Sequence, residues 1–247
     1  MMLFPSYRTR RSAPLTVQSV SRSHIGKVRS VNEDRLLDCA DRTLWAIADG
    51  MGGHQLGDRA ATIVVRALAQ LVGAEGPFDS ASIAAALDSA NGEIAALARD
   101  AGHICGSTVA ALHIADRRYT LFWAGDSRVY RLRDRKLQRL TRDHSVVQEM
   151  TDAGLITEAQ GRNHPQANVI TRAIGIDRAV QLESATGSVR PGDLFLLCSD
   201  GLSALLSDDV LCAMLGTGLD EAASRLLNAA LDSGGRDNIS LILVSLT

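Results

Sequence analysis

Two apolar segments of this chain end in the same way, with an aspartate followed by a glycine. The segment 44–48 leads into Asp49-Gly50, and the segment 194–199 leads into Asp200-Gly201. Each segment has the length and apolar character of a buried strand, and the glycine after each acid lets the chain turn. A carboxylate held against a hydrophobic core is costly unless a positive charge compensates it. The pattern therefore predicts a β-rich core with acids at its strand ends.

Further acids repeat this placement. Glu33-Asp34 lies at the start of a strand-like segment, and Asp237 directly precedes the apolar segment 239–246. An Asp-Gly pair alone is more typical of a hairpin corner. Acids gathered at several strand ends instead require a cation between them, so the joint pattern predicts a metal site. Oxygen ligands favour Mg²⁺ or Mn²⁺, and the histidines and cysteines show no zinc-binding spacing.

The composition excludes several classes of protein. A net charge of −2 over 247 residues gives no electrostatic reason to bind nucleic acid or a membrane surface. No segment approaches the roughly 18 apolar residues of a membrane span, and the first residues make a poor signal peptide. The segment 1–14, with three arginines and two prolines, is predicted to be a flexible tail. We expect a soluble, cytoplasmic protein.

The remaining chain reads as one α+β domain, 15–247. Helical periodicity predicts paired helices, two before the middle strands and two near the carboxyl end. Strands in blocks between helix pairs predict a four-layer α-β-β-α sandwich, two mostly antiparallel sheets covered by helices. A polar segment at about 144–178, with two short helical patterns, is predicted to be a flap beside the site. The predicted strands are 15–21, 35–39, 44–48, 108–115, 119–124, 128–133, 182–189, 194–198 and 239–246, and the predicted helices are 58–71, 79–98, 208–215 and 220–231.

An acid shared by two cations suits one reaction in particular. Two ions about 3.5–4 Å apart can clamp an in-line displacement at phosphorus and activate water between them. Phosphoryl transfer also needs a positive group on the other phosphate oxygens, and Arg29 lies four residues before Glu33. An isolated arginine near a turn is more often simply solvated, but beside a carboxylate cluster Arg29 is a candidate phosphate clamp.

The motifs that contain these residues resemble those of the bacterial metal-dependent protein phosphatases of the PPM (type 2C) family. The match is specific, because eight motifs occur in the order of the family and span residues 29 to 238. They are RSVNED (29–34), ADGMGGH (48–54), GST (106–108), GDSR (125–128), DHS (143–145), TRAIG (171–175), CSDGL (198–202) and GRDN (235–238). The resemblance implies a catalytic domain that hydrolyses phosphoserine and phosphothreonine in proteins with a water activated by two Mn²⁺ or Mg²⁺ ions.

The resemblance also implies roles for individual residues. Asp49 would bridge the two metals, and Arg29 would hold the substrate phosphate, so these two are the candidate catalytic residues. Asp34 would orient the ligands and waters from behind. The other implied metal ligands are Glu33 and the Gly50 carbonyl on one ion, Asp200 and Asp237 on the other, and Asp126 with Asp200 on a third, weaker ion.

One position departs from the animal members of the family. They carry a histidine directly after the Asp-Gly pair as general acid, whereas this chain has Met51, as bacterial relatives do. His54 follows three residues later and is interpreted as a loop residue. The general acid therefore stays open.

The compact length and the flap also resemble phosphatases encoded with type VI secretion systems. That likeness implies, as partners, a Ser/Thr kinase, its phosphorylated substrates and a forkhead-associated scaffold protein. The protein itself is expected to be a monomer.

Two other functions stay open on the residues alone. The chain could be an inactive family member that acts as a binding module, although the intact Glu33, Asp49, Asp200, Asp237 and Arg29 argue against decay of the site. It could also be another two-metal hydrolase, such as a nuclease or a small-molecule phosphatase, but a nuclease would need a basic groove.

Overall fold

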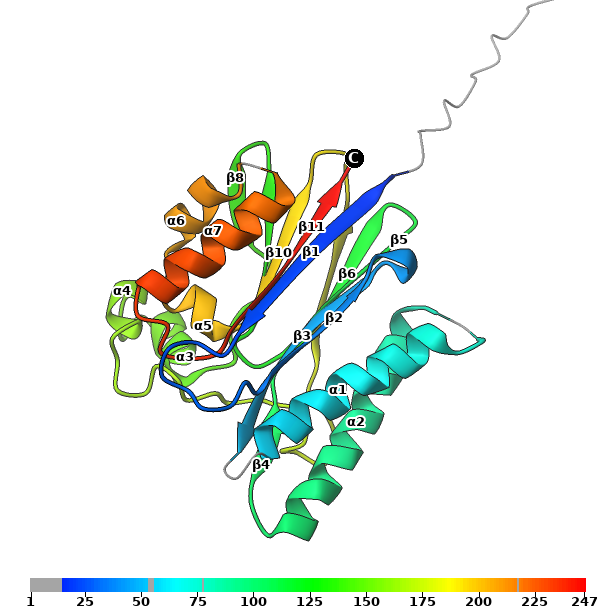
Figure 1. Cartoon of the computed structure of the whole chain (residues 1–247). Helices are drawn as coiled ribbons and strands as arrows, with labels where there is room; N and C mark the ends of the chain where they lie inside the picture. The colour runs from blue at the N-terminus through cyan, green and yellow to red at the C-terminus, as the bar shows by residue number, and fades with distance from the viewer. Residues whose placement is uncertain (1–14, 53–55, 77, 217) are drawn as a thin grey trace, which may run out of the picture.

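Two antiparallel sheets packed face to face form the centre of the computed structural model (Figure 1). The structure describes residues 15–52, 56–76, 78–216 and 218–247, so the predicted tail 1–14 and His54 lie outside the described residues. The first sheet has the order β1 (Val17–His24), β11 (Ile239–Leu246), β10 (Leu194–Cys198), β7 (Arg128–Arg133) and β8 (Lys136–Arg139). The second has the order β2 (Asp34–Cys39), β3 (Leu44–Gly52), β5 (Val109–Ala115), β6 (Arg118–Ala124) and β9 (Glu183–Ser188), with β4 (Cys105–Ser107) paired to β3.

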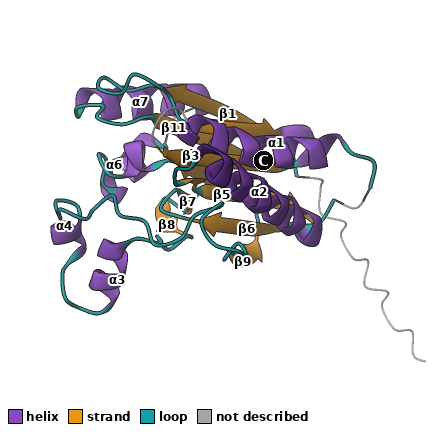
Figure 2. Ribbon diagram, turned by 90° about the horizontal axis from the view of Figure 1, so that it is seen from below, coloured by secondary structure: helices purple, strands orange, loops and turns teal. Residues whose placement is uncertain are grey.

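Helices cover both outer faces of the sandwich (Figures 1 and 2). The helices α1 (Leu56–Gly73) and α2 (Ser80–Ala101) pack on the second sheet, and α5 (Asp200–Ser203), α6 (Asp208–Met214) and α7 (Leu219–Asp232) pack on the first. A third apolar cluster fills the space between the sheets. These four layers confirm the predicted α-β-β-α sandwich.

The apolar runs seen in the sequence follow from burial on both faces of the sheets. In β3, Trp45 and Ile47 point toward the opposite sheet, while Leu44, Ala46 and Ala48 point toward the helices. All five residues are fully buried. A strand covered on both faces has no solvent side that would favour polar residues, so its sequence is continuously apolar.

Local signals set the ends of the long helix α2. Asp79 is its N-cap, because the Asp79 carboxylate accepts a hydrogen bond from the backbone N–H of Ser82, and the Ser82 hydroxyl accepts one from the N–H of Asp79. Gly102 ends the helix in the left-handed conformation at φ +67°. This capping box and left-handed glycine stop are common helix ends, and they place the helix within a few residues of its predicted range.

The structure corrects the predicted turns at the two Asp-Gly pairs. Strand β3 runs on through Asp49 and Gly50 to Gly52, and Asp200-Gly201 begins the short helix α5. Both glycines serve close packing instead of a turn. A Cβ atom on Gly50 would lie 2.0 Å from the carbonyl oxygen of Gly57 in α1. The strand β4, the short helix α5 and the 3₁₀ turn Ala40–Arg42 were not predicted from the sequence.

The segment predicted as a flap contains α3 (Val146–Asp152) and α4 (Glu158–Gly161), which lie together beside the end of the sandwich (Figure 2). One isolated bridge, between Ser107 and Ile174, joins this segment to the body of the chain, and a second, between Ser145 and Ile170, lies within it. Its role as a separate subdomain stays a prediction. None of the helices in the described part of the chain has the length and apolar character needed to cross a membrane.

Candidate metal centre

The predicted metal ligands come from both sheets and meet at one end of the sandwich. Asp34, the first residue of β2, stands opposite Asp49 of β3 in the antiparallel register. Asp200 begins α5 directly after β10, and Asp237 lies just before β11. Asp126 lies in the turn between β6 and β7. Acids that are far apart in the sequence thus lie in the same region of the structure.

Burial and mutual repulsion raise the pKa values of these carboxyl groups. Burial is the main cause for Asp34, whose pKa rises to about 7, and for Asp200, whose pKa rises to about 6. Burial also raises the pKa values of Asp49 and Asp126, and neighbouring carboxylates raise them further. Asp49 is influenced by Asp34, Asp200, Asp126 and Asp237 together. The structure therefore brings these aspartates close enough for their negative charges to repel one another.

The donor set fits a hard cation. Among the described residues, no three His, Cys, Asp or Glu side chains already converge as a formed ion site would require. However, Asp34 Oδ1 and Asp200 Oδ1 are buried without a hydrogen-bond partner, and buried polar atoms seldom stay unpaired. A set of carboxylate oxygens with a net negative charge is the chemistry that Mg²⁺ and Mn²⁺ prefer. The residues thus fit such ions.

Glu33 is held against the beginning of helix α1. Its backbone N–H donates to the Asn238 side-chain oxygen at 2.8 Å, and its carbonyl accepts from the Gly50 N–H at 3.2 Å. Its carboxylate accepts a hydrogen bond from the backbone N–H of Asp58. A Cβ atom on Gly57 would lie 2.5 Å from Glu33 Oε1. A helix N-terminus favours a carboxylate here, although burial still raises the Glu33 pKa.

Arg29 reaches this group of acids from the loop between β1 and β2. Its Nη2 lies 2.7 Å from Asp237 Oδ2, and 51% of its side chain is exposed. The hydrogen bond to Asp237 raises the Arg29 pKa, and Glu33 and Asp200 add to the shift. Arg29 is therefore positioned at the solvent side of the acids, where a phosphate group could compete with Asp237 for its guanidinium.

Three polar residues that the sequence analysis left without a role hold the acids in place. The Thr108 hydroxyl accepts from the Asp49 N–H at 3.1 Å, and the Ser199 hydroxyl donates to Asp34 Oδ2 at 2.8 Å. The Asn238 amide group donates to two carbonyls of the β1–β2 loop, at 2.9 and 3.0 Å. All three lie within the matched motifs. Ser199 and Asn238 also stand next to an acid in the sequence, which was the available signal for these two.

The raised pKa values predict that the metal-free protein loses stability as the pH rises. The native state keeps protons on Asp34 and its neighbours that the unfolded chain, with ordinary carboxyl pKa values near 4, has already released. The native state binds more protons than the unfolded chain in this pH range, so the free energy of unfolding falls as the pH rises. Between about pH 6.5 and about pH 8.5 we expect the melting temperature to drop by roughly 5 °C.

Calorimetric melting in a chelating buffer measures this effect. The window lies above the titration of the two buried histidines, His113 and His144, whose pKa values are lowered by burial, so they do not mask it. An Asp34→Asn variant should show a flatter pH profile. A melting temperature that rises through this window would contradict the assignment.

The fold matches those of solved bacterial Ser/Thr protein phosphatases. PppA, a key regulatory component of the type VI secretion system in Pseudomonas aeruginosa, is 36% identical and superposes with a TM-score of 0.86, covering 95% of this chain and 100% of that one. The catalytic domain of the phosphatase PstP, solved in complex with two manganese ions, gives the same TM-score at 36% identity and covers the same shares of both chains.

The chain belongs to the protein phosphatase 2C family, whose model matches residues 21–233. The Ser/Thr protein phosphatase PstP of Mycobacterium tuberculosis is 39% identical over 233 residues, which are 93% of this chain and 45% of that protein. The chain therefore spans less than half the length of that relative. The Ser/Thr phosphatase stp of Listeria monocytogenes is 31% identical, over 90% of this chain and 93% of its own length.

Proposed function

We propose that this chain is a metal-dependent protein phosphatase that hydrolyses phosphoserine and phosphothreonine in proteins. The observation that carries the proposal is the group of buried and half-buried acids that several strand ends bring together, with Arg29 beside it. Membership of the protein phosphatase 2C family and the manganese ions of the PstP structure support the same activity.

We assign the roles within the site as the family resemblance implies. Two Mn²⁺ or Mg²⁺ ions would supply charge neutralisation and an activated water. Asp49, at the centre of the acids, would be shared between the ions, and Asp34 would hold its neighbours in place through Ser199. Arg29 would release Asp237 and bind the phosphate oxygens. The proposed ligands are Glu33, the Gly50 carbonyl, Asp49, Asp200 and Asp237, with Asp126 and Asp200 at a third ion.

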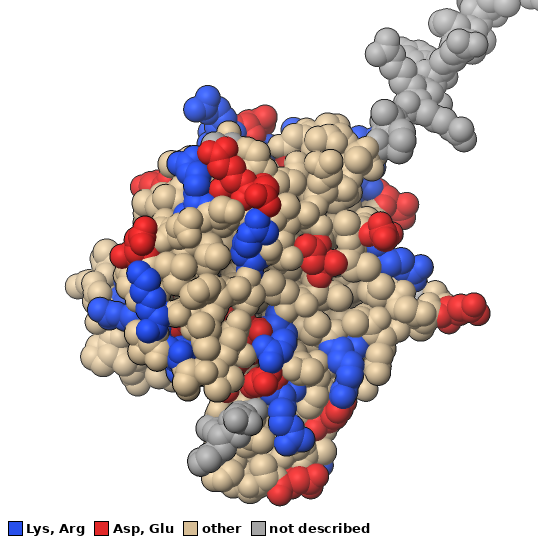
Figure 3. Space-filling view, viewed as in Figure 1, with Lys and Arg blue, Asp and Glu red and all other residues tan. Residues whose placement is uncertain are grey.

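The surface agrees better with a protein substrate than with nucleic acid. On the face shown in Figure 3, Lys and Arg side chains alternate with Asp and Glu side chains. The chain as a whole has a net charge of −2. A nuclease would neutralise a run of phosphates with a continuous basic surface.

We further propose that the protein acts in the cytoplasm, as a monomer, in opposition to a bacterial Ser/Thr kinase and on that kinase's substrates. The likeness to PppA, a type VI secretion component, supports a forkhead-associated scaffold protein of such a system as one substrate. Phosphoproteomics of a deletion strain would test these partners, because the true substrates should gain phosphate on Ser or Thr.

Phosphate release from a phosphothreonine peptide tests the activity itself. We expect turnover with added Mn²⁺ and none after the metal is stripped and EDTA is in excess, because without the ions nothing activates water or offsets the negative charge of the acids beside the phosphate. Thiol-blocking reagents should have little effect, since Cys105 and Cys198 are buried and burial raises both thiol pKa values. Full turnover in excess EDTA would refute the proposed mechanism, and an inactive protein that binds phosphopeptide would indicate a binding module.

Removal of the Arg29 guanidinium should separate phosphate binding from metal binding. In Arg29→Ala we expect kcat/KM on the peptide to fall by about tenfold or more, because the bidentate phosphate contact is lost. Mn²⁺ binding should be nearly unchanged, because Asp237 is then free of its ion pair. Arg22→Ala, which removes a surface ion pair with Asp220, is the matched control. Calorimetric Mn²⁺ titration of both variants decides the matter, and an equal loss of metal affinity and kcat/KM in Arg29→Ala would refute this role.

A further inference from the structure

The turn that carries Asp126 is held from one side by the dipeptide Asp143-His144. Gly125, the residue before Asp126, has φ +105°, a conformation that few other residues adopt. Its backbone N–H donates to His144 Nδ1 at 3.2 Å, and its carbonyl accepts from the His144 N–H at 2.9 Å. Both backbone polar groups of Gly125 are thus satisfied by His144.

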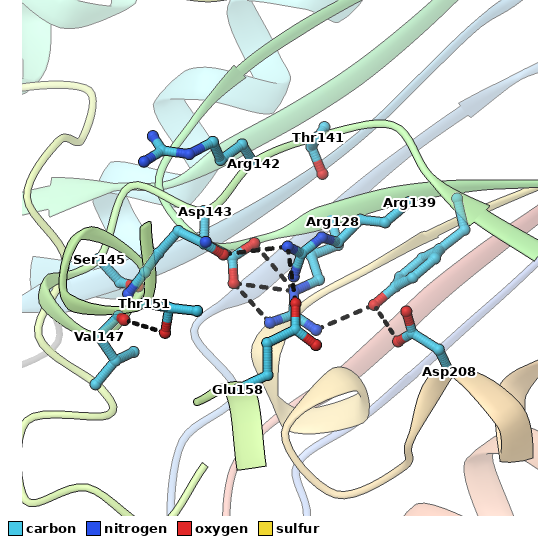
Figure 4. Close-up of polar contacts among 12 residues, drawn as sticks. Arg128, Arg139, Thr141, Arg142, Asp143, Ser145, Val147, Thr151, Glu158 and Asp208 are labelled. Carbon is cyan, nitrogen blue, oxygen red and sulfur yellow. Dashed lines mark hydrogen bonds and ion pairs between the residues drawn. The ribbon is translucent and has the colours of Figure 1, made fainter. Parts of the chain in front are cut away.

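Asp143 fixes the other end of the same turn (Figure 4). Its carboxylate accepts a bifurcated hydrogen bond from Arg128 Nε, at 3.0 Å to each oxygen, and a second hydrogen bond from Nη2 at 2.6 Å. Arg128 also donates to the Tyr130 hydroxyl at 3.0 Å. The four-residue turn 125–128 is therefore hydrogen-bonded to His144 at its first residue and to Asp143 at its last.

The surroundings of His144 keep its ring fixed and neutral. His144 is 3% exposed, and its ring stacks on Trp123 with 6.3 Å between centroids and 12° between planes. Desolvation lowers its pKa. Because Nδ1 accepts from Gly125, the ring hydrogen lies on Nε2, which is 3.3 Å from Glu183 Oε1 without forming a regular hydrogen bond.

The turn connects Asp126 to the centre of the site. The Ser127 hydroxyl lies 2.8 Å from the Thr108 hydroxyl, which accepts the Asp49 N–H. On the other side, Ser145, next to His144, caps helix α3 by accepting from the Gln148 N–H at 3.3 Å. His144 thus lies where the Asp126 turn meets the segment 144–178, and the turn itself is linked to Asp49 of β3 through Ser127 and Thr108.

We propose that His144 is a positioning residue, whose acceptor nitrogen fixes the Gly125 peptide and so orients Asp126 for metal binding. The inference rests on the proposed function only in taking Asp126 as a metal ligand. A side chain of similar bulk without an acceptor would leave the buried Gly125 N–H unpaired, and the turn would move to satisfy it. Groups that orient metal ligands from behind typically change metal affinity by tenfold or more.

Two variants at this position separate the acceptor from simple packing. His144→Leu keeps much of the bulk but removes the acceptor, whereas His144→Asn places a side-chain oxygen near the position of Nδ1. We expect His144→Leu to raise the Mn²⁺ concentration for half-maximal activity, and the calorimetric Kd of the weakest Mn²⁺ site, by about tenfold. In His144→Asn both values should return to within about threefold of the wild type. Hydrogen exchange at the Gly125 amide should be fast in the Leu variant and slow in the Asn variant.

His113→Leu is the matched control. His113 is also buried, at 5% exposure, but it lies in β5 against the Phe78 ring, outside the site. The His113→Leu substitution should lower the melting temperature without changing the dependence of activity on Mn²⁺ concentration. Unchanged Mn²⁺ dependence and Kd in His144→Leu, or equal losses in the Leu and Asn variants, would overturn the inference. Absence of activity in the wild type, with Mn²⁺ binding that still depends on His144, would instead overturn the proposed function alone.

Discussion

Asp49→Asn is expected to lower turnover of a phosphothreonine peptide by about 100-fold or more, because the substitution removes the negative charge placed between the proposed ions. Mn²⁺ affinity should fall with turnover. The loss should not come from unfolding. Burial and four neighbouring carboxylates raise the pKa of Asp49, so a neutral amide of nearly the same shape removes an unfavourable charge from the native state.

Steady-state kinetics, calorimetric Mn²⁺ titration and thermal melting of the same preparation test this expectation. Asp38→Asn is a suitable control, since Asp38 lies in the neighbouring strand β2, and its Oδ1 accepts from the Trp45 indole at 3.0 Å outside the site. It should keep wild-type turnover. If Asp49→Asn bound Mn²⁺ and turned over substrate as the wild type does, Asp49 would not be the shared ligand.

The sequence predicted the parts of the fold that depend on periodicity. Strands such as β3 and β10 are buried on both faces, so their apolar runs were unmistakable. The helices α1 and α2 showed regular apolar spacing, and α2 had its cap at Asp79. The acids were also visible, because a charged residue at the end of a long apolar run is unusual.

The contacts between distant segments could not be predicted in the same way. The two Asp-Gly pairs fitted turns, whereas the structure uses their glycines for close approach, which depends on where α1 and the segment after Asp237 happen to lie. Asn238 pairs with residues more than 200 positions away. Hydrogen bonds between segments so far apart produce no repeating pattern in the sequence. The roles of Asn238, Thr108 and Ser199 in holding the acids were therefore seen only in the three-dimensional structure.

Gly201→Ala is expected to destabilise the protein by about 3 kcal/mol, near the upper end of the usual cost of overpacking. A Cβ atom at Gly201 would lie 1.9 Å from the carbonyl oxygen of Asn238 and 2.9 Å from its carbonyl carbon. Backbone atoms cannot rotate away as a side chain can. The segment containing Asp237 would have to move away from α5, which begins with Asp200, so two of the proposed ligands would separate.

Thermal melting and Mn²⁺ titration measure both consequences. We expect a fall in melting temperature of roughly 6–12 °C, together with weaker Mn²⁺ binding. Gly92→Ala is the matched control, because Gly92 lies inside α2 with nothing within 4 Å of its added Cβ, and alanine there should stabilise the helix by about 0.5–1 kcal/mol. If Gly201→Ala lowered the free energy of unfolding while Gly92→Ala raised it, the two segments that carry Asp200 and Asp237 would need a glycine at position 201 in order to pack together. Wild-type stability and Mn²⁺ affinity in Gly201→Ala would show that these segments do not pack as described.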